Sequence, residues 1–128
     1  MVIILILWQI KCGEEETFIK AWKEDFVVDN RDKLIGEFLS KPVDDVKDVY
    51  KNWTVASFGD PVEDVTTYVN VGMWDSLESF IEEIERYIPE PGTPLPPFQV
   101  ARYRVILEPV AWRIGSTKLP ESDSDGTF

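Results

Sequence analysis

The chain has 128 residues, of which 44% are hydrophobic, and this is enough for one domain with its own core. Its 24 Asp and Glu residues outnumber its 13 Lys and Arg residues, and the net charge of -11 would repel nucleic acid and anionic membranes alike. The chain has no histidine and a single cysteine, which excludes imidazole metal sites, histidine-dependent catalytic triads and an internal disulfide. We therefore expect no nucleic acid, membrane or metal partner, and the lone thiol of Cys12 fits a cytoplasmic, reducing compartment.

The first predicted element, residues 2–11 (VIILILWQIK), is apolar almost throughout. Such a run, without alternation, is typical of a strand whose two faces are both covered. Helices can cover only one face of a sheet in so short a chain, so the sheet of a second subunit would cover the other. The run is also too short to cross a bilayer. It predicts a homodimer that packs through its sheet faces.

A helix is predicted after the turn at Gly13, because three glutamates at residues 14–16 place negative charge in its first turn. Phe18, Trp22 and Phe26 then form an apolar stripe. Residues 34–40 (LIGEFLS) predict a second strand. Residues 42–65 combine helical spacing with turn signals, so we interpret them as an insertion that contains one short helix and a loop.

Residues 66–88 change from a strand pattern to a helix pattern at Trp74. Tyr68, Asn70 and Trp74 have one parity, so they are expected to project from one face of the strand toward a common space. Asn70 is the polar misfit of this apolar strand, because a buried amide costs about 1 to 3 kcal/mol when it lacks partners. A ligand, a neighbouring backbone or a buried water would each satisfy it.

The helix after this strand is predicted to begin with Asp75 as its N-cap, with Glu78 reaching back in a capping box. Residues 89–97 (PEPGTPLPP) hold five prolines in nine residues, which predicts an extended connector. The last strand is predicted within residues 98–115, where apolar and other residues alternate again beyond a bend at Pro109. Residues 116–128 are small, polar and acidic, which is typical of a disordered tail, so the single domain is expected to span residues 1–115.

The predicted order of elements is strand, helix, strand, insertion, strand, helix, strand, which is the order of an α+β, ferredoxin-like fold with an antiparallel sheet. The apolar first strand leads into a charged helix, and the third strand ends in Trp before a Ser- and Glu-containing helix start, MWDSLESF. In these features the chain resembles the antibiotic biosynthesis monooxygenase group of dimeric α/β-barrel proteins. The resemblance covers residues 2–114 in outline.

The resemblance implies a homodimer whose two sheets pack together, with a cavity between the sheet and the helices of each subunit. Members of the group include oxygenases, haem-degrading enzymes and small aldehyde- or quinone-handling proteins. The leading expectation is a monooxygenase that uses no cofactor and acts on a small aromatic or phenolic molecule, whose electron-rich anion itself reduces oxygen. The haem-degrading branch of the group uses an Asn near the first strand, a Trp at the end of the third strand and a His on the next helix. Only Trp74 matches, since the first strand offers Gln9 and the helix has no His, so haem degradation is not expected.

Seven residues are candidates for the site. The candidate catalytic residues are Asn70, Trp74 and Tyr68, and the candidate substrate-binding residues are Trp8, Arg102, Arg104 and Trp112. Arg would hold negative charge, Asn would hydrogen-bond a ring oxygen, and the aromatic rings would stack on a planar substrate. The alternatives are that the aromatic residues fill the core and the arginines lie on a solvated edge or in an intersubunit ion pair, in a non-catalytic ligand-binding or dimeric assembly module. A cavity of about 300 Å³ or more would favour binding, and a filled core would favour the alternative.

Overall fold

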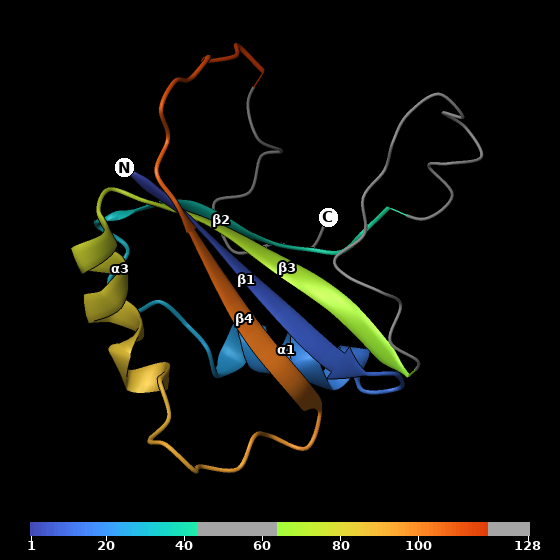
Figure 1. The fold of residues 1–128 in the computed structure, drawn as a ribbon. Helices are drawn as coiled ribbons and strands as arrows, with labels where there is room; N and C mark the ends of the chain where they lie inside the picture. The colour runs from blue at the N-terminus through green and yellow to red at the C-terminus, as the bar shows by residue number, and fades with distance from the viewer. Residues whose placement is uncertain (44–63, 118–128) are drawn as a thin grey trace.

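Four antiparallel strands form one sheet in the order β2-β3-β1-β4 (Figure 1). The computed structural model describes residues 1–43 and 64–117. Within them the elements follow one another as β1 (Val2–Lys11), α1 (Glu15–Glu24), β2 (Leu34–Ser40), β3 (Val65–Trp74), α3 (Leu77–Ile84), a 3-10 turn η1 (Glu85–Tyr87) and β4 (Gln99–Leu107). This arrangement confirms the predicted α+β, ferredoxin-like fold.

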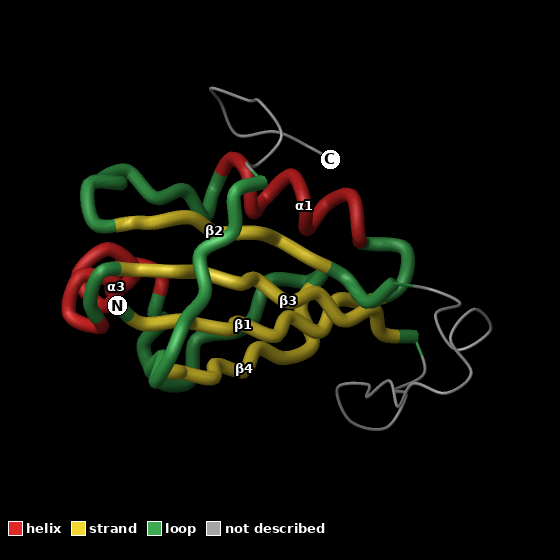
Figure 2. The backbone as a smooth tube through the Cα atoms, turned by 90° about the horizontal axis from the view of Figure 1, so that it is seen from above, coloured by secondary structure: helices red, strands yellow, loops and turns green. Residues whose placement is uncertain are grey.

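Both helices pack against the same face of the sheet, and Figures 1 and 2 show their positions relative to the strands. Strand β1 pairs with both β3 and β4, so it lies inside the sheet. Most of its even-numbered residues are buried under the helices, namely Val2, Ile4, Trp8 and Ile10. Its odd-numbered apolar residues, Ile3, Leu5 and Leu7, point to the opposite face and are only partly covered. The apolar run therefore supplies one face to the core and a second apolar face that the helices do not cover.

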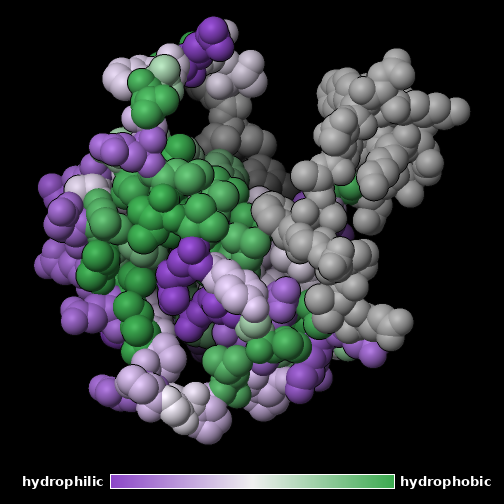
Figure 3. All heavy atoms as spheres, in the orientation of Figure 1, coloured by the Kyte–Doolittle hydropathy of each residue, from purple (hydrophilic) through white to green (hydrophobic). Residues whose placement is uncertain are grey.

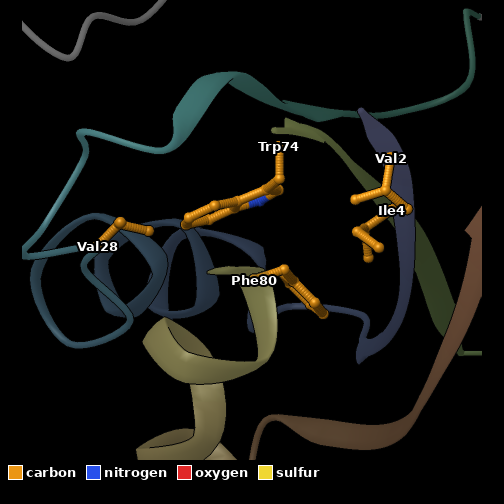
Figure 4. Close-up of a cluster of buried hydrophobic side chains, with 5 residues drawn as sticks. All are labelled: Val2, Ile4, Val28, Trp74 and Phe80. Atoms are coloured by element: carbon orange, nitrogen blue, oxygen red, sulfur yellow. The ribbon is translucent and has the colours of Figure 1, made fainter. Parts of the chain in front are cut away.

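The core on the helix face has two parts. The first surrounds Trp74, whose ring meets that of Phe80 edge to face with centroids 5.8 Å apart, and it is completed by Val2, Ile4 and Val28 (Figure 4). The second surrounds Phe18 of α1, which is fully buried between the sheet residues Trp8, Ile10 and Tyr68. Most of the buried side chains here are large and aromatic or β-branched. The buried polar residues on this face, such as Asn70, are therefore exceptions to the apolar core.

Helix α3 begins one residue later than the sequence predicted. Ser76 has an extended backbone, and its side-chain oxygen accepts a hydrogen bond from the backbone N–H of Ser79 at 3.2 Å. This is the geometry of an N-cap, so the prediction of Asp75 at this position is wrong. Asp and Ser cap helices about equally well, so composition alone did not distinguish the two neighbours.

Strand β4 ends at Leu107, which agrees with the predicted bend at Pro109, but the prediction that the strand pattern continues beyond this bend is wrong. Leu107 pairs with Ile3 of β1, and β1 itself begins at Val2, so the ladder has almost no partner left beyond this point. Pro109 follows, and it has no backbone N–H to donate. The alternating Val110, Trp112 and Ile114 consequently stand in solvent, with 97%, 78% and 87% of their surface exposed.

Three predictions concern the connecting segments. Most of the insertion at residues 42–65 and of the tail at residues 116–128 lies outside the described residues. Residues 89–97 form neither helix nor strand, as five prolines require.

The thiol of Cys12 is free and exposed. Within residues 1–43 and 64–117, no helix has the length and apolar character needed to cross a membrane.

Candidate functional site

A cavity of about 50 Å³ lies between the helix face of the sheet and the helices. Its wall on the helix side is aromatic and aliphatic, whereas polar side chains project into it from the sheet. It is lined by Ile6, Trp8, Trp22, Phe26, Val28, Glu37, Asn70, Trp74, Phe80, Ile84, Tyr87, Arg102 and Arg104. Five of the seven residues proposed from sequence are in this set.

Strand register brings the polar residues of the cavity together. Ile6 of β1 pairs with Asn70 on one side and with Arg104 on the other, and Trp8 pairs with Arg102. Because paired residues of neighbouring strands point to the same face, Asn70, Trp8 and both arginines project to the helix side of the sheet. The sequence did not show toward which face of the sheet the arginines point, and the pairing of β4 with β1 establishes it.

Asn70 is 4% exposed, which confirms that the polar residue of β3 is buried. Its Nδ2 donates a hydrogen bond to Oε2 of Glu37 on β2 at 3.1 Å. Its Oδ1 is buried and has no hydrogen-bond partner in the described part of the chain. A buried acceptor without a partner costs about 1 to 3 kcal/mol, so this atom calls for a donor beyond residues 1–43 and 64–117.

Trp8 has a buried hydrogen-bond donor that lacks an acceptor among the described residues. Its ring is 3% exposed, and its indole N–H finds no acceptor within residues 1–43 and 64–117. The ring packs against Phe18 and Phe26 with centroids 5.1 and 5.4 Å apart, so the aromatic wall holds it in place. Two residues that line the cavity, Trp8 and Asn70, therefore have one buried donor and one buried acceptor that the described residues leave unsatisfied.

Two arginines occupy the β4 side of the cavity. The guanidinium carbon of Arg102 lies 4.6 Å from the centre of the Trp8 ring, in a cation–π contact. Burial, together with the neighbouring charge of Arg104, lowers the pKa of Arg102 to about 10. Loss of hydration also lowers the pKa of Arg104, although its side chain reaches the surface at the edge of the sheet. Both cations are thus held in an environment that favours a negative partner.

Glu37 is a charged residue of this site that the sequence analysis did not single out. It lies on β2 opposite Gly72, two residues along from the pairing of Leu39 with Asn70, and so reaches the Asn70 amide diagonally. It gives the cavity a carboxylate at the side opposite the arginines. Trp22 and Tyr87 were not singled out as site residues either, and the Tyr87 hydroxyl is already donated to the backbone oxygen of Val27.

The other candidates from sequence have different environments. Trp74 touches the cavity but is 1% exposed and packs mainly as a core residue. Tyr68 shares the face of Asn70 but does not line the cavity, because its ring packs on Phe18 with centroids 5.2 Å apart. Burial and, secondarily, the charge of Glu15 raise its pKa, so it stays a neutral phenol. Trp112 lies beyond the end of β4 and does not reach this cavity.

The cavity thus offers a proton acceptor, a hydrogen-bond acceptor, a hydrogen-bond donor and two cations within an aromatic shell. Residues 1–43 and 64–117 contain no group of three or more His, Cys, Asp or Glu side chains that could hold a metal ion. The polar groups suit a small organic molecule that has a hydroxyl group and negative charge.

Comparison with solved structures supports the ferredoxin-like fold that the sequence resemblance implied. In particular, the chain is similar to two structures of MhuD. One is a point mutant with two manganese protoporphyrin IX molecules bound per active site (TM-score 0.55). The other is the heme-degrader MhuD from Mycobacterium tuberculosis with two hemes bound in its active site (TM-score 0.52).

Both comparisons cover 90% of this chain and 100% of the MhuD chain at 17% sequence identity. At this identity the likeness establishes the fold. The sequence itself matches no protein-family model and no curated protein.

Proposed function

We propose that the cavity binds a small aromatic or phenolic molecule. The observation that carries this proposal is the pair of buried, unsatisfied atoms, Asn70 Oδ1 and Trp8 Nε1, in one cavity with an aromatic wall. A hydroxyl group on the ligand can donate to the first atom, and a ring or phenolate oxygen can accept from the second. The volume of about 50 Å³ is well below the roughly 300–1,000 Å³ of sites that enclose a drug-sized ligand. The ligand is therefore a single ring or one end of a larger molecule.

The chemistry we propose is cofactor-independent oxygenation. Glu37 takes the proton of the substrate, Asn70 positions the substrate oxygen, and the indole N–H of Trp8 stabilises the resulting anion. The anion then reduces dioxygen. With an anthrone, for example, the CH₂ group becomes C=O, one oxygen atom enters the product and the other leaves as water with the two hydrogens. All four electrons come from the substrate, so no metal or cofactor is required.

Haem, which the structural neighbours bind, does not fit this site. The chain has no histidine to ligate iron, and the hydroxyl of Tyr87 in the aromatic wall donates to the backbone oxygen of Val27. The space is also far too small for a porphyrin. One water molecule needs about 10–15 Å³ of such space, so the cavity of about 50 Å³ holds only about four water molecules. Haem therefore takes no part in the proposed reaction.

A second candidate is a non-catalytic binding or assembly module, and the small volume of the cavity favours it. Aromatic side chains fill most of the space between sheet and helices, as Phe18 and Trp74 show by being at most 1% exposed. In this case the cavity would hold a ligand or a few waters and no reaction would follow. The two candidates differ in turnover, and an assembly module would in addition bind no ligand.

We also propose that the protein is a homodimer that packs through the open face of the sheet. The apolar side chains on this face include Tyr103, Val105 and Leu107 of β4, which are 57%, 42% and 42% exposed. Figure 3 shows hydrophobic residues gathered over the upper parts of β1 and β4. Exposed apolar surface of this kind is typical of an interface.

The segment after β4 supports the same proposal. Val110, Trp112 and Ile114 are almost fully exposed, and a second subunit would give these apolar side chains a surface to pack against. In the dimer Trp112 would then contact the partner subunit. The exposed, unpaired thiol of Cys12 is in keeping with the cytoplasmic location we propose for this dimer.

The test of oxygenation is incubation with a panel of hydroquinones and anthrones in air, with quinone formation followed by absorbance. Turnover is expected to fall in Asn70→Ala and Glu37→Gln and to be retained in Glu78→Gln, a matched loss of one exposed carboxylate. Binding by calorimetry without any turnover would leave the second candidate standing. Sedimentation velocity tests the dimer, which Val105→Arg is expected to dissociate; a wild-type monomer at high concentration would refute it.

A further inference from the structure

The β4 side of the cavity concentrates positive charge in an otherwise acidic protein. Arg102 and Arg104 project from the same face of the edge strand, and the chain as a whole has a net charge of -11. No salt bridge joins either guanidinium group to a carboxylate within residues 1–43 and 64–117. Two adjacent cations that lose hydration without gaining an anion are unfavourable, so their position points to an anionic ligand.

The distribution of polar groups across the sheet gives this ligand a direction. In the strand order β2-β3-β1-β4, Glu37 is at one edge, Asn70 and Trp8 are in the middle, and the arginines are at the other edge. Asn70 and Arg104 lie on strands separated by β1, so their backbones are about 10 Å apart. A ligand that meets both must have its hydroxyl group and its negative charge at opposite ends of one ring.

We propose that the cavity selects a single-ring aromatic carboxylate with a hydroxyl group opposite the carboxylate, as in 4-hydroxybenzoate. This proposal rests on the small-molecule binding proposed above and specifies its ligand class. The carboxylate lies at the mouth of the cavity between Arg102 and Arg104, where charge-assisted hydrogen bonds are strongest. The ring packs on Trp22 and Phe26, and the hydroxyl group donates to Asn70 Oδ1.

The buried acceptor of Asn70 supports the hydroxyl end of this assignment independently of the arginines. A ligand without the hydroxyl group leaves Asn70 Oδ1 unsatisfied, and a site with a buried unpaired acceptor discriminates strongly against such a ligand. A neutral ligand leaves the two cations unpaired in the same way. Selectivity is thus expected at both ends of the ring.

The test is isothermal titration calorimetry with three matched ligands. 4-Hydroxybenzoate is expected to bind about tenfold or more tightly than 4-hydroxybenzyl alcohol, which lacks the charge. It is also expected to bind more tightly than 2-hydroxybenzoate, whose two groups are adjacent. The preference for the charged ligand should disappear in Arg102→Met/Arg104→Met and persist in Arg113→Met, which removes one exposed positive charge outside the cavity. Arg104→Met alone, at an exposed position, keeps the test available if the double variant does not fold.

The outcomes separate this proposal from the one on which it rests. If the alcohol binds as tightly as the carboxylate, small-molecule binding stands and the selection of an anion is refuted. If both 4-substituted ligands bind no more tightly than inorganic chloride or phosphate, aromatic binding itself fails. If 2-hydroxybenzoate binds as tightly as 4-hydroxybenzoate, the two-ended arrangement across the sheet is wrong.

Discussion

The contact between Asn70 and Glu37 makes a prediction that depends on pH. In Asn70→Asp, a carboxylate of nearly the same shape replaces the amide whose Nδ2 lies 3.1 Å from the Glu37 carboxylate. The donor of this hydrogen bond is lost, and two negative charges face each other in a largely buried position. The variant must either tolerate the repulsion or take up a proton.

Uptake of a proton costs less free energy than the repulsion between the two carboxylates. Two unit charges 3.1 Å apart repel by about 5 kcal/mol at an effective dielectric constant of ~20. Protonation of one carboxyl group at pH 7 costs about 4 kcal/mol, from about 1.4 kcal/mol per unit over the roughly three units above its ordinary pKa. The protonated group then donates to the other carboxylate and restores a hydrogen bond. The free energy of unfolding is therefore expected to fall by up to about 4 kcal/mol at pH 7.

The sign of the pH dependence follows from this proton. The folded variant binds one proton more than the unfolded chain between about pH 4 and the raised pKa of the pair, so stability is lost as pH rises through this window. The deficit relative to wild type is expected to grow by about 1.4 kcal/mol per unit from pH 4 to pH 7. Urea unfolding monitored by far-UV circular dichroism measures it, with Asn70→Leu as a control whose deficit has no such slope.

A deficit in the free energy of unfolding of Asn70→Asp that is the same at pH 4.5 and at pH 7.5 would contradict this prediction. Such a result would mean that Glu37 and Asn70 are not in contact in solution. A steep slope in the Asn70→Leu control would instead show that the pH dependence arises elsewhere in the protein. The first result would also remove Glu37 as the proton acceptor of the proposed reaction.

Three further predictions concern the scaffold. Phe18→Ala is expected to lower the free energy of unfolding by about 3–5 kcal/mol in urea titrations, because the ring is fully buried between α1 and the sheet; a loss below ~1 kcal/mol would contradict this packing. Ser76→Ala should lower the free energy of unfolding by about 1 kcal/mol in the same assay, because the α3 N-cap is lost. An unchanged free energy of unfolding would indicate that Asp75 is the N-cap instead. Hydrogen bonds from its own backbone N–H and from Thr66 lower the pKa of Glu15, so it contributes stability above its unfolded value of 4.5 that is lost as pH falls through the folded pKa. Glu15→Gln should therefore show a shallower loss of thermal stability below pH 4.5 than wild type, and equal slopes would exclude the contribution.

Local periodicity accounts for what the sequence could predict. The alternation of apolar residues placed Tyr68, Asn70 and Trp74 on one face of a strand, and all three are buried on the helix face. The single polar side chain in that set identified Asn70 before any contact was known. This inference needed only the two-residue period of one strand, which is present in the sequence.

The rest of the site depends on pairings between strands that are distant in sequence. Glu37 reaches Asn70 only because Leu39 pairs with Asn70, and β2 has a register shift between Leu34 and Gly36 that sets this alignment. A slip of one residue would turn Glu37 to the open face. The arginines of β4 depend in the same way on pairing with β1. No pattern within either strand contains this information.

Strand β1 joins the cavity and the proposed dimer interface in one element. Ile6 and Trp8 line the cavity, and Leu5 and Leu7, their immediate neighbours, lie on the open face. A subunit packed on the open face would hold this strand in place, so ligand binding and dimer formation would be coupled, and each would strengthen the other by the same factor. Leu5→Glu is therefore expected to weaken ligand binding in calorimetry although its side chain does not touch the cavity. Ile81→Glu, an exposed change on α3 away from both, should leave the affinity unchanged. Equal affinities for wild type and Leu5→Glu, when only the variant is monomeric, would show that the two faces of β1 act independently.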